Sequence, residues 1–349
     1  LVGMAAAASL HGVDIGAAEV ADWTVGPLVG VSIAAVLQRG LATLHREQGA
    51  GLRLGSYRLE EKLGEGGMGE VWRAIHPLLA RKAAVKVIRP TLIDKDQHHS
   101  ERRFEREARA IAALESPHTV RVYDFGITAE GRRFLAMELL DGFDLHALVK
   151  RFGPQPSDRA VAITIQVCHS LAEAHAVGLV HRDIKPANIM LCRRGADVDH
   201  VKVLDFGSVG RRTPSEVDPQ LTGEHTLLGT PAYLAPEALQ GPGAAVGKTD
   251  IYGLGCVAYW LLTGRHVFDF SSAMMQIAAH LKDRPEPPSA HGAEVPEPLE
   301  RLVLACLEKD PEDRPTATAL ADKLRALPSA DNWSVEAAQR WWRAPVAET

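Results

Sequence analysis

The sequence has few cysteines, and they are scattered. Its four cysteines form no CxxC pair, and its fifteen histidines form no HxxxH or HExxH pattern. Isolated cysteines are typical of buried thiols in a reducing compartment, and they argue against a disulfide framework or a zinc site. The chain therefore gives no sign of secretion or of a structural metal. The cysteines are Cys168, Cys192, Cys256 and Cys306.

The chain also lacks a positive charge balance. It carries 39 Lys and Arg against 44 Asp and Glu, a formal net charge of -5. A nucleic-acid-binding domain is normally basic, so no nucleic-acid partner is expected. The hydrophobic content of 46% over 349 residues is enough for a packed core, and the length suits one two-lobed unit with flanking segments.

No apolar run is long enough for a clear membrane span. Residues 23–38 carry no charge, but a span needs about 20 apolar residues, and Pro27 interrupts the run. Two interpretations of residues 1–50 stay open. The segment is a buried or amphipathic helix before a cytoplasmic domain, or it is the remnant of a membrane or sensor region that anchors the chain through sequence at or before residues 1–40.

The chain is organised around residues 180–207, which contain VHRDIKPANIML and, after a short polar stretch, VKVLDFG. Asp183, Lys185 and Asn188 fall in one loop, and Asp205 follows an apolar strand. One carboxylate to receive a hydroxyl proton, a cation for the transferred phosphate, and an amide plus a carboxylate for Mg²⁺ are the groups that phosphoryl transfer needs.

With both motifs at this spacing, the sequence resembles the protein kinase family, specifically the eukaryotic-type (Hanks-type) bacterial serine/threonine kinases. The resemblance implies an α+β, two-lobed protein kinase fold, with an antiparallel sheet and an αC helix in the N-lobe and a mostly helical C-lobe. It implies ATP and Mg²⁺ (or Mn²⁺) as cofactors, and protein substrates with Ser/Thr acceptors, the chain itself included. It covers residues 57–327, divided into an N-lobe (57–137), a hinge (138–142) and a C-lobe (143–327).

In this resemblance Asp183 is the catalytic base, Lys185 stabilises the γ-phosphate, and Asn188 and Asp205 bind the metal. Lys185, in HRDIKPAN, and Thr230, in GTPAYLAPE, are typical of serine/threonine rather than tyrosine kinases. Small-molecule phosphotransferases share the HxDxxxxN loop but lack the GTPxYxAPE segment. A non-catalytic, nucleotide-sensing scaffold is the main alternative, and against it every chemical position is present.

A glycine-rich loop precedes the catalytic motifs. Gly64, Gly66, Gly69 and Val71 match GxGxxGxV, where glycines let the backbone approach phosphates closely. A dinucleotide-binding fold can begin with the same pattern, but a helix would then follow it. The residues after Gly69 alternate like a strand, which favours the kinase interpretation.

Lys86 lies in a short apolar strand, residues 83–88, and in the resemblance it holds the α and β phosphates. Residues 102–114 predict a helix whose apolar stripe includes Phe104 and Ala108. Glu107 falls on that same stripe. A carboxylate on a packing face needs a cationic partner, so we expect Glu107 to pair with Lys86.

The remaining nucleotide contacts come from the resemblance alone. Met137 is the gatekeeper, and the hinge from Glu138 to Leu140 binds adenine through its backbone. Asp144 matches the ribose-contacting acid, although it is also a natural cap for the next helix. The residues expected to sandwich adenine are Leu63, Val71, Ala84 and Met190.

Regulation is expected in the long segment after Gly207. Arg182 precedes the catalytic Asp183, and in such kinases a phosphorylated residue of this segment pairs with the arginine. Thr226 and then Thr222 are the expected autophosphorylation sites, in register back from Thr230. Glu224 is the alternative partner for Arg182.

Three further features are expected to be structural. Asp250 is predicted to cap the helix at 251–262 and, in the resemblance, to brace the catalytic loop, and Glu237 is expected to pair with Arg314. Residues 328–349 hold half of the six tryptophans, and they predict a helix capped by Ser334. This Trp-rich C-terminal helix either docks its aromatic residues on the C-lobe or contacts a partner or membrane interface.

Overall fold

The computed structural model of the chain describes residues 53–66, 69–89, 97–128, 131–195, 197–206, 231–239, 247–328, 330 and 332–343. The chain divides into two compact units, of which the smaller contains residues 1–60 and 75–80 and the larger contains residues 61–74 and 81–349. In the smaller unit, β1 (Arg53–Leu54) pairs antiparallel with the start of β2 (Tyr57–Gly66). Every described residue of the predicted site belongs to the larger unit.

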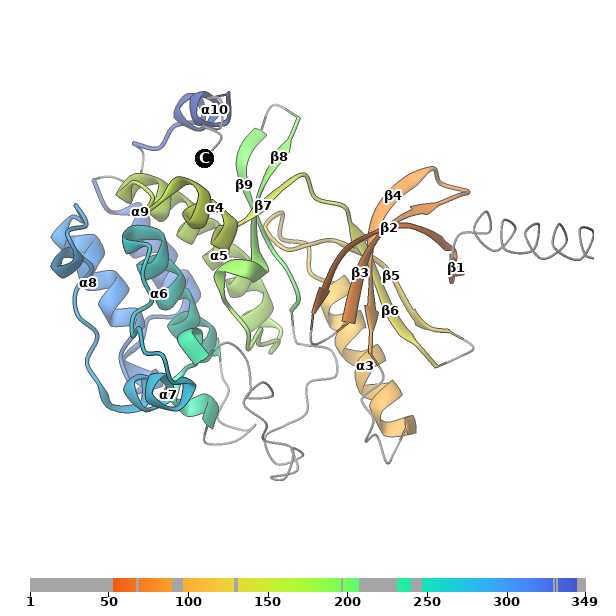
Figure 1. Cartoon of the computed structure of the whole chain (residues 1–349), viewed down its shortest axis with the longest axis horizontal. Helices are drawn as coiled ribbons and strands as arrows, with labels where there is room; N and C mark the ends of the chain where they lie inside the picture. The colour runs from red at the N-terminus through yellow and green to blue at the C-terminus, as the bar shows by residue number, and fades with distance from the viewer. Residues whose placement is uncertain are drawn as a thin grey trace, which may run out of the picture. The chain divides into compact units, whose positions relative to one another are not determined.

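A twisted sheet forms the first part of the larger unit (Figure 1). Its strands follow the order β2-β3-β4-β6-β5, and β6 is antiparallel to both of its neighbours. Their bounds are β3 (Gly69–His76), β4 (Arg81–Ile88), β5 (Val122–Ile127) and β6 (Arg133–Glu138).

One helix, α3 (Gln97–Ala112), accompanies this sheet. Its stripe of Phe104, Ala108 and Ile111 is buried, as the apolar spacing predicts. The Phe104 ring meets Phe125 of β5 edge-on, with centroids 6.3 Å apart. The stripe therefore fixes which face of α3 turns toward the sheet.

A second, three-stranded sheet joins the first part of the unit to the helices. It has the order β7-β8-β9, with β7 (Gly142–Asp144), β8 (Ile189–Arg194) and β9 (Asp197–Val203) all antiparallel. A short 3₁₀ turn, η1 (Pro186–Asn188), leads directly into β8. The loop that carries Asp183 and Lys185 therefore ends where this sheet begins.

Helices make up most of the rest, and α6 (Gly247–Thr263) is at their centre, with every residue from Thr249 to Leu262 buried. It begins before Asp250, so the prediction that Asp250 caps this helix is wrong. The other bounds are α4 (Leu145–Phe152), α5 (Ser157–Ala176), α7 (Ala273–Lys282), α8 (Glu297–Cys306), α9 (Ala317–Arg325), α10 (Val335–Arg343), η4 (Pro231–Tyr233), η5 (Pro236–Leu239), η6 (Pro288–His291) and η7 (Pro311–Asp313).

The four cysteines are free and buried, as their spacing predicts. Burial raises the pKa of the Cys192 and Cys306 thiols to about 12, so both stay protonated and unreactive at neutral pH. Within the described ranges, no helix is long and apolar enough to cross a membrane. Residues 1–50, on which the membrane interpretation depends, lie outside those ranges.

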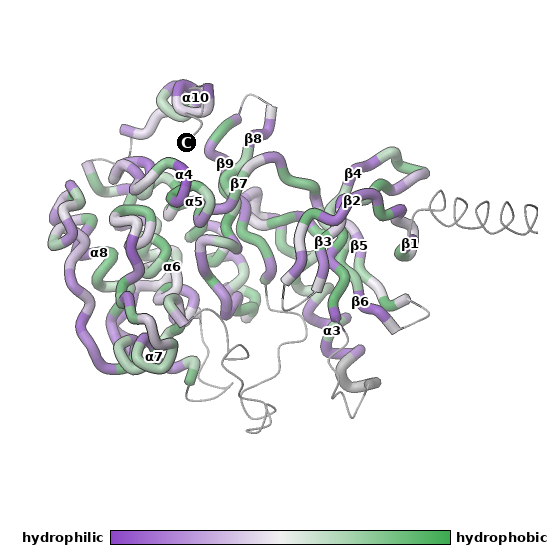
Figure 2. The backbone as a smooth tube through the Cα atoms, viewed as in Figure 1, coloured by the Kyte–Doolittle hydropathy of each residue, from purple (hydrophilic) through white to green (hydrophobic). Residues whose placement is uncertain are grey.

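Helix α10 docks on the C-lobe and contacts β9. Trp341 and Trp342 pack against the main hydrophobic core, and Ser334 caps the helix by accepting a hydrogen bond from the Ala337 amide at 3.2 Å. Mostly purple and pale shades mark α10 in Figure 2, because the helix carries charged and amide side chains and because tryptophan is nearly neutral in hydropathy. The first interpretation of the tail is confirmed for these residues.

Candidate active site

The catalytic loop brings three predicted residues together. Lys185 Nζ lies 2.9 Å from Asp183 Oδ2. The Asn188 side-chain amide donates to Asp183 Oδ2 at 3.1 Å and to the Asp183 carbonyl oxygen at 2.8 Å. The Asp183 side chain is about nine-tenths buried, with 9% of its surface exposed. One carboxylate oxygen is thus held between a cation and an amide.

Asp250 holds the backbone of this loop in place. This carboxylate is buried, and it accepts hydrogen bonds from the amides of His181 at 2.8 Å and Arg182 at 2.7 Å. His175 Nε2 lies 2.8 Å from the same carboxylate. The bracing role expected of Asp250 is confirmed, while sequence reasoning did not identify His175 as its neighbour.

Two residues of the site have left-handed backbones. Arg182 has φ of +65° and Asp205 has φ of +56°, conformations that cost about 1–3 kcal/mol for residues other than glycine. The surrounding hydrogen bonds keep them there. The Arg182 amide is fixed by Asp250, and the residue before Asp205, Leu204, donates its amide to the Asn188 carbonyl oxygen at 2.8 Å.

His181 joins the catalytic loop to the segment that carries Asp205. Its Nε2 lies 2.6 Å from the Leu204 carbonyl oxygen, and its ring meets Phe206 with centroids 4.8 Å apart. The catalytic loop and the segment that carries Asp205 are more than twenty positions apart in the sequence, and these contacts of His181 hold them side by side. Leu204 and Phe206, the two neighbours of Asp205, are thereby held against the catalytic loop.

The expected ion pair between Lys86 and Glu107 does not form among the described residues. Lys86 Nζ instead lies 2.7 Å from Asp205 Oδ2. Glu107 Oε1 accepts from Arg103 Nε at 3.1 Å, and Glu107 Oε2 is buried without a hydrogen-bond partner. Arg103 lies one turn earlier on α3, so it reaches the carboxylate through local helix geometry, whatever the distance of α3 from β4.

Several of the residues predicted to hold adenine, but not Leu63 or Met190, belong to one hydrophobic cluster. Ala84 and Met137 are buried in it, and Val71 and Leu140 pack against it. Leu204 packs there too and was not foreseen. Leu63 is 42% exposed, and Met190 lies opposite Asp144 in the pairing of β8 with β7.

Glu138, the first residue of the predicted hinge, is held by a lysine that sequence reasoning did not single out. Lys202 Nζ lies 2.6 Å from Glu138 Oε1, and that oxygen also accepts from the Arg121 amide at 2.8 Å. Lys202 is 3% exposed. A lysine inside the apolar run VKVL was the available signal, because a buried ammonium needs an acidic partner.

Of the three glycines predicted at the phosphate loop, Gly69 has a clear steric requirement. Its φ is +147°, and a Cβ there would overlap the carbonyl oxygen of Val87 on β4. Gly64 and Gly66 have open space around the Cβ position. The last glycine thus serves the close approach of β3 to β4, while the first two leave room above the sheet.

Asp144 caps α4, as its alternative interpretation suggests. Its Oδ1 accepts a hydrogen bond from the Ala147 amide at 2.7 Å. This bond uses one carboxylate oxygen, so a ribose contact through the other oxygen is compatible with it. The cap also fixes the direction in which β7 passes into the helix.

The donor set fits a divalent hard cation. Because the Asn188 amide nitrogen donates to Asp183, its side-chain oxygen is left as an acceptor. With the Asp205 carboxylate it supplies oxygen ligands, which Mg²⁺ prefers. In the part of the chain that the structure describes, no cluster of three or more His, Cys, Asp or Glu residues could hold a metal.

The expected pair of Glu237 and Arg314 is confirmed. Arg314 donates to both carboxylate oxygens, at 2.7 and 2.9 Å, and both side chains are almost fully buried. Burial opposes ionisation of Glu237, but the hydrogen bonds from Arg314 and from Thr249 outweigh it, so the Glu237 pKa is lowered. This pair holds the described end of the GTPAYLAPE segment on α6.

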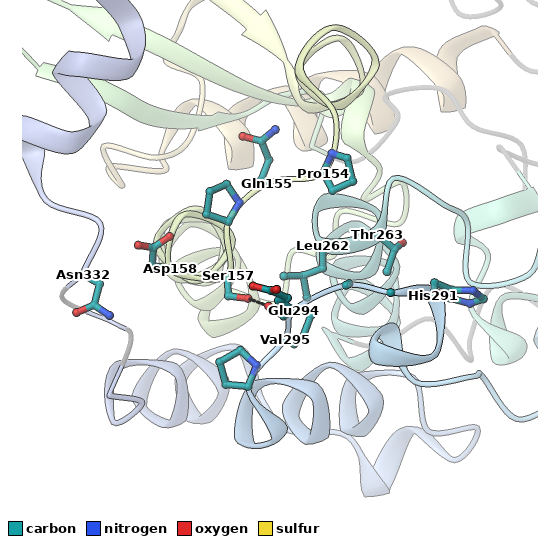
Figure 3. Close-up of a pocket in the computed structure, with 14 residues that line it drawn as sticks. Pro154, Gln155, Ser157, Asp158, Leu262, Thr263, His291, Glu294, Val295 and Asn332 are labelled. Carbon is teal, nitrogen blue, oxygen red and sulfur yellow. Dashed lines mark hydrogen bonds between the residues drawn. The ribbon is translucent and has the colours of Figure 1, made fainter.

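A pocket of about 600 Å³ lies elsewhere in the C-lobe, between the start of α5 and the segment before α8 (Figure 3). The Ser157 hydroxyl donates to the Glu294 carbonyl oxygen at 3.0 Å, and Asn332 and His291 stand at opposite sides. None of the predicted site residues lines this pocket. It is therefore separate from the catalytic loop.

Residues 57–324 match the family model of the protein kinase domain. The chain therefore belongs to the protein kinase family, and both the resemblance and the predicted two-lobed α+β fold are confirmed. A solved structure of Rad53 residues 1–466 in complex with AMP-PNP has the same fold, with a TM-score of 0.64, 24% identity, and coverage of 79% of this chain and 65% of that one.

The curated relatives are bacterial serine/threonine-protein kinases. Pkn3 of Myxococcus xanthus is 39% identical over 274 residues, which are 78% of this chain and 50% of the relative. PkaA of Streptomyces coelicolor is 39% identical over 78% of this chain and 50% of the relative, and PknH of Mycobacterium tuberculosis is 38% identical over 76% and 40%. The chain thus spans half or less of the length of these relatives.

Several expectations fall outside the described residues. These are the autophosphorylation sites, the threonine of the GTPAYLAPE segment, the alternative partner of Arg182 and the N-terminal segment. They remain predictions, on Thr222, Thr226, Thr230, Glu224 and residues 1–50.

Proposed function

We propose that the chain transfers the γ-phosphate of ATP to serine and threonine hydroxyls of proteins. The observation that carries the proposal is the convergence of Lys185 and Asn188 on the Asp183 carboxylate, each within hydrogen-bond distance of it. Asp205 and Lys86 supply an adjacent ion pair. The relatives named serine/threonine-protein kinases support this choice of acceptor.

Each residue has a separate task in this mechanism. Asp183 accepts the proton of the attacking hydroxyl, and Lys185, 2.9 Å away, offsets negative charge on the transferred phosphoryl group. Asn188 and Asp205 would hold Mg²⁺, which neutralises phosphate charge when bound. Because the transition state of phosphoryl transfer is loose, positioning and charge neutralisation supply most of the acceleration.

The N-lobe positions the nucleotide. Lys86 holds the α and β phosphates, and the cluster around Ala84 and Met137 receives adenine. Glu107 is assigned as the partner that Lys86 takes in the working enzyme. Its buried and unpartnered Oε2 supports this assignment, because a buried carboxylate oxygen without a donor is costly.

Asp183→Asn tests the proposal. We expect phosphotransfer to a generic protein substrate to fall by about 10²–10⁴-fold, the usual contribution of a general base. ATP affinity, measured by calorimetry, should stay within a few-fold, because Asp183 holds neither the metal nor the nucleotide. Asp197→Asn, an exposed aspartate in the same lobe, is the matched control and should behave like the wild type.

The results would distinguish the proposed phosphotransfer from the alternative, a nucleotide-sensing scaffold. Near wild-type transfer by Asp183→Asn would show that the mechanism is wrong. A wild-type chain that binds ATP but transfers no phosphate would favour the nucleotide-sensing scaffold.

Regulation by autophosphorylation is part of the proposal. Its support is the position of Arg182 beside Asp183, together with threonines in register before Thr230. We expect phosphate at Thr226 and then Thr222 in peptide maps of ATP-treated protein. The Thr222→Ala/Thr226→Ala protein should lose at least about tenfold in activity, as is usual when an ordering phosphate is removed.

A further inference from the structure

Asp199 has no assigned part in catalysis, yet both of its carboxylate oxygens accept hydrogen bonds from several donors. Arg159 donates to both of its carboxylate oxygens, at 2.9 and 2.8 Å. Two indole nitrogens of the C-terminal tail donate to the same oxygens, Trp333 at 2.8 Å and Trp342 at 2.5 Å. Asp199 has φ of +56° and is 6% exposed. A strained, buried acid on β9 is thus held jointly by α5 and the tail.

The tail also stacks on β7 and α4. The Trp342 ring lies parallel to Phe143 of β7, with centroids 4.9 Å apart and an angle of 24°. Trp341 meets Phe152 of α4 edge-on at 4.7 Å, and its ring covers the Arg159 guanidinium at 3.7 Å. In Figure 1, α10 accordingly lies beside the β8–β9 hairpin and above α4.

The strand register connects this contact to the nucleotide residues. Phe143 lies opposite Leu191, and the next pair is Asp144 with Met190. Successive residues of a strand face opposite sides of the sheet. The tail therefore packs on the face behind Asp144 and Met190, the residues assigned to ribose and adenine.

The same sheet leads to Asp205, the residue proposed to bind the metal. Strand β9 contains Asp199 and ends at Val203, two positions before Asp205. A tail that fixes Asp199 at one end of β9 and Phe143 on β7 therefore holds both outer strands of the sheet.

We propose that Trp342 is a positioning residue for the nucleotide, acting through Phe143 and Asp199 on the sheet β7–β8–β9. This inference rests on the proposed function. It assigns the tail a specific task, to hold the back of the sheet so that Asp144 and Met190 keep their places. The Arg159 guanidinium by itself neutralises the Asp199 carboxylate. Charge pairing therefore does not require the two additional indole donors.

The test compares Trp342→Ala and Trp342→Phe in the full chain with Val335→Ala, which changes an exposed residue of the same helix. We expect Trp342→Ala to raise the ATP KM and the ATP Kd, measured by calorimetry, by about threefold to thirtyfold, the range of coupling through packed networks. The kcat and the KM for the protein substrate should stay within about twofold, because uniform nucleotide binding is what is lost.

Trp342→Phe keeps the stack and removes the N–H donor, so an intermediate ATP KM is expected. If Trp342→Ala does not fold, this variant carries the test. Phe143→Leu should reproduce the effect, and the double variant Phe143→Leu/Trp342→Ala should be little worse than the worse single one. A lower Tm with unchanged ATP KM in the folded variants would reduce the tail to a stabilising element and overturn the inference.

Failure of the proposed function is distinguishable from failure of this inference. A wild-type chain that binds ATP without transferring phosphate contradicts the former, while the calorimetric comparison still decides the latter. A wild-type chain that does not bind ATP contradicts both. Equal ATP affinity of the wild type and Trp342→Ala contradicts the positioning role alone.

Discussion

Two ion pairs of the molecule differ in burial and in number of partners. The reactive pair, Lys86 with Asp205, lies in the candidate active site, and the scaffold pair, Arg314 with Glu237, holds elements of the C-lobe together. Lys86 and Asp205 keep 14% and 29% of their side-chain surface exposed and meet at 2.7 Å. Arg314 and Glu237 are 0% and 5% exposed. Arg314 donates to both carboxylate oxygens and also to the carbonyl oxygens of Glu308, Lys248 and Lys309.

This difference follows from what each pair must do. A partly exposed pair with few constraints loses little free energy when its partner changes, because water screens both charges. A buried pair that loses one partner leaves a desolvated charge. We therefore expect the pair of Arg314 and Glu237 to keep its partners, and Lys86, Asp205 and Glu107 to exchange partners when a substrate binds.

The sharpest contrast comes from breaking the scaffold pair. Arg314→Ala should lower the free energy of unfolding by about 3–5 kcal/mol, because it leaves the Glu237 carboxylate buried and uncompensated. Arg301→Ala is the control, since its pair with Glu297 is 65% and 77% exposed, and it should cost less than about 0.5 kcal/mol. Urea unfolding measures both, and equal losses would remove the distinction.

A buried histidine of the C-lobe, His280, should make the free energy of unfolding depend on pH. His280 is buried and lies 2.8 Å from the Tyr252 hydroxyl. Burial, with a smaller contribution from the nearby Lys309 charge, lowers its pKa from 6.5 to about 4. Between these two pKa values the unfolded chain binds a proton that the native chain does not. The contribution of His280 to the free energy of unfolding is therefore fully present above pH 6.5 and is lost as the pH falls toward 4.

The expected loss from this group between pH 7 and pH 4 is about 3 kcal/mol. His280→Gln removes the titration, so its unfolding free energy should fall less over the same interval. Urea unfolding at several pH values measures the slope. Parallel curves for the two proteins would show that His280 does not cause the loss.

For the reactive pair, function and stability should separate. Lys86→Met should lower phosphotransfer at least about 100-fold, since the cation proposed to hold the α and β phosphates is lost. The unfolding free energy should fall by less than about 1 kcal/mol, because the pair is partly exposed. Lys82→Met, an exposed lysine on the same strand, is the control. A stability loss as large as that of Arg314→Ala would contradict the comparison.

The smallest effect is expected on α3. Arg103→Ala removes the pair with Glu107 and should cost about 0.3–0.5 kcal/mol, the usual value for a partner one turn away. Phosphotransfer should stay the same or rise, because the Glu107 carboxylate is then available to Lys86. Arg109→Ala, whose pair with Glu105 has the same spacing, serves as the control. Lower activity in Arg103→Ala alone would assign Arg103 a supporting role.

Local pattern predicted much of this protein. The HRD and DFG motifs indicated the fold, and the spacing of apolar residues predicted the face of α3 that is buried. The Glu237–Arg314 pair was also expected and is present. The cap at Asp144 and the cap at Ser334 were likewise readable, because each depends on residues within three positions.

Side-chain type and spacing act over one or two turns, so the chemical groups of the chain and many of its short strands and helices could be predicted from them. Tertiary packing settled which groups meet. It placed Arg103 rather than Lys86 on Glu107, Lys202 on Glu138, and two tail tryptophans on Asp199. Most of these partners lie on different elements, and Arg103, which lies on the same helix as Glu107, takes the place expected for Lys86. Which partner is chosen depends on distances between elements, and no local pattern encodes those distances.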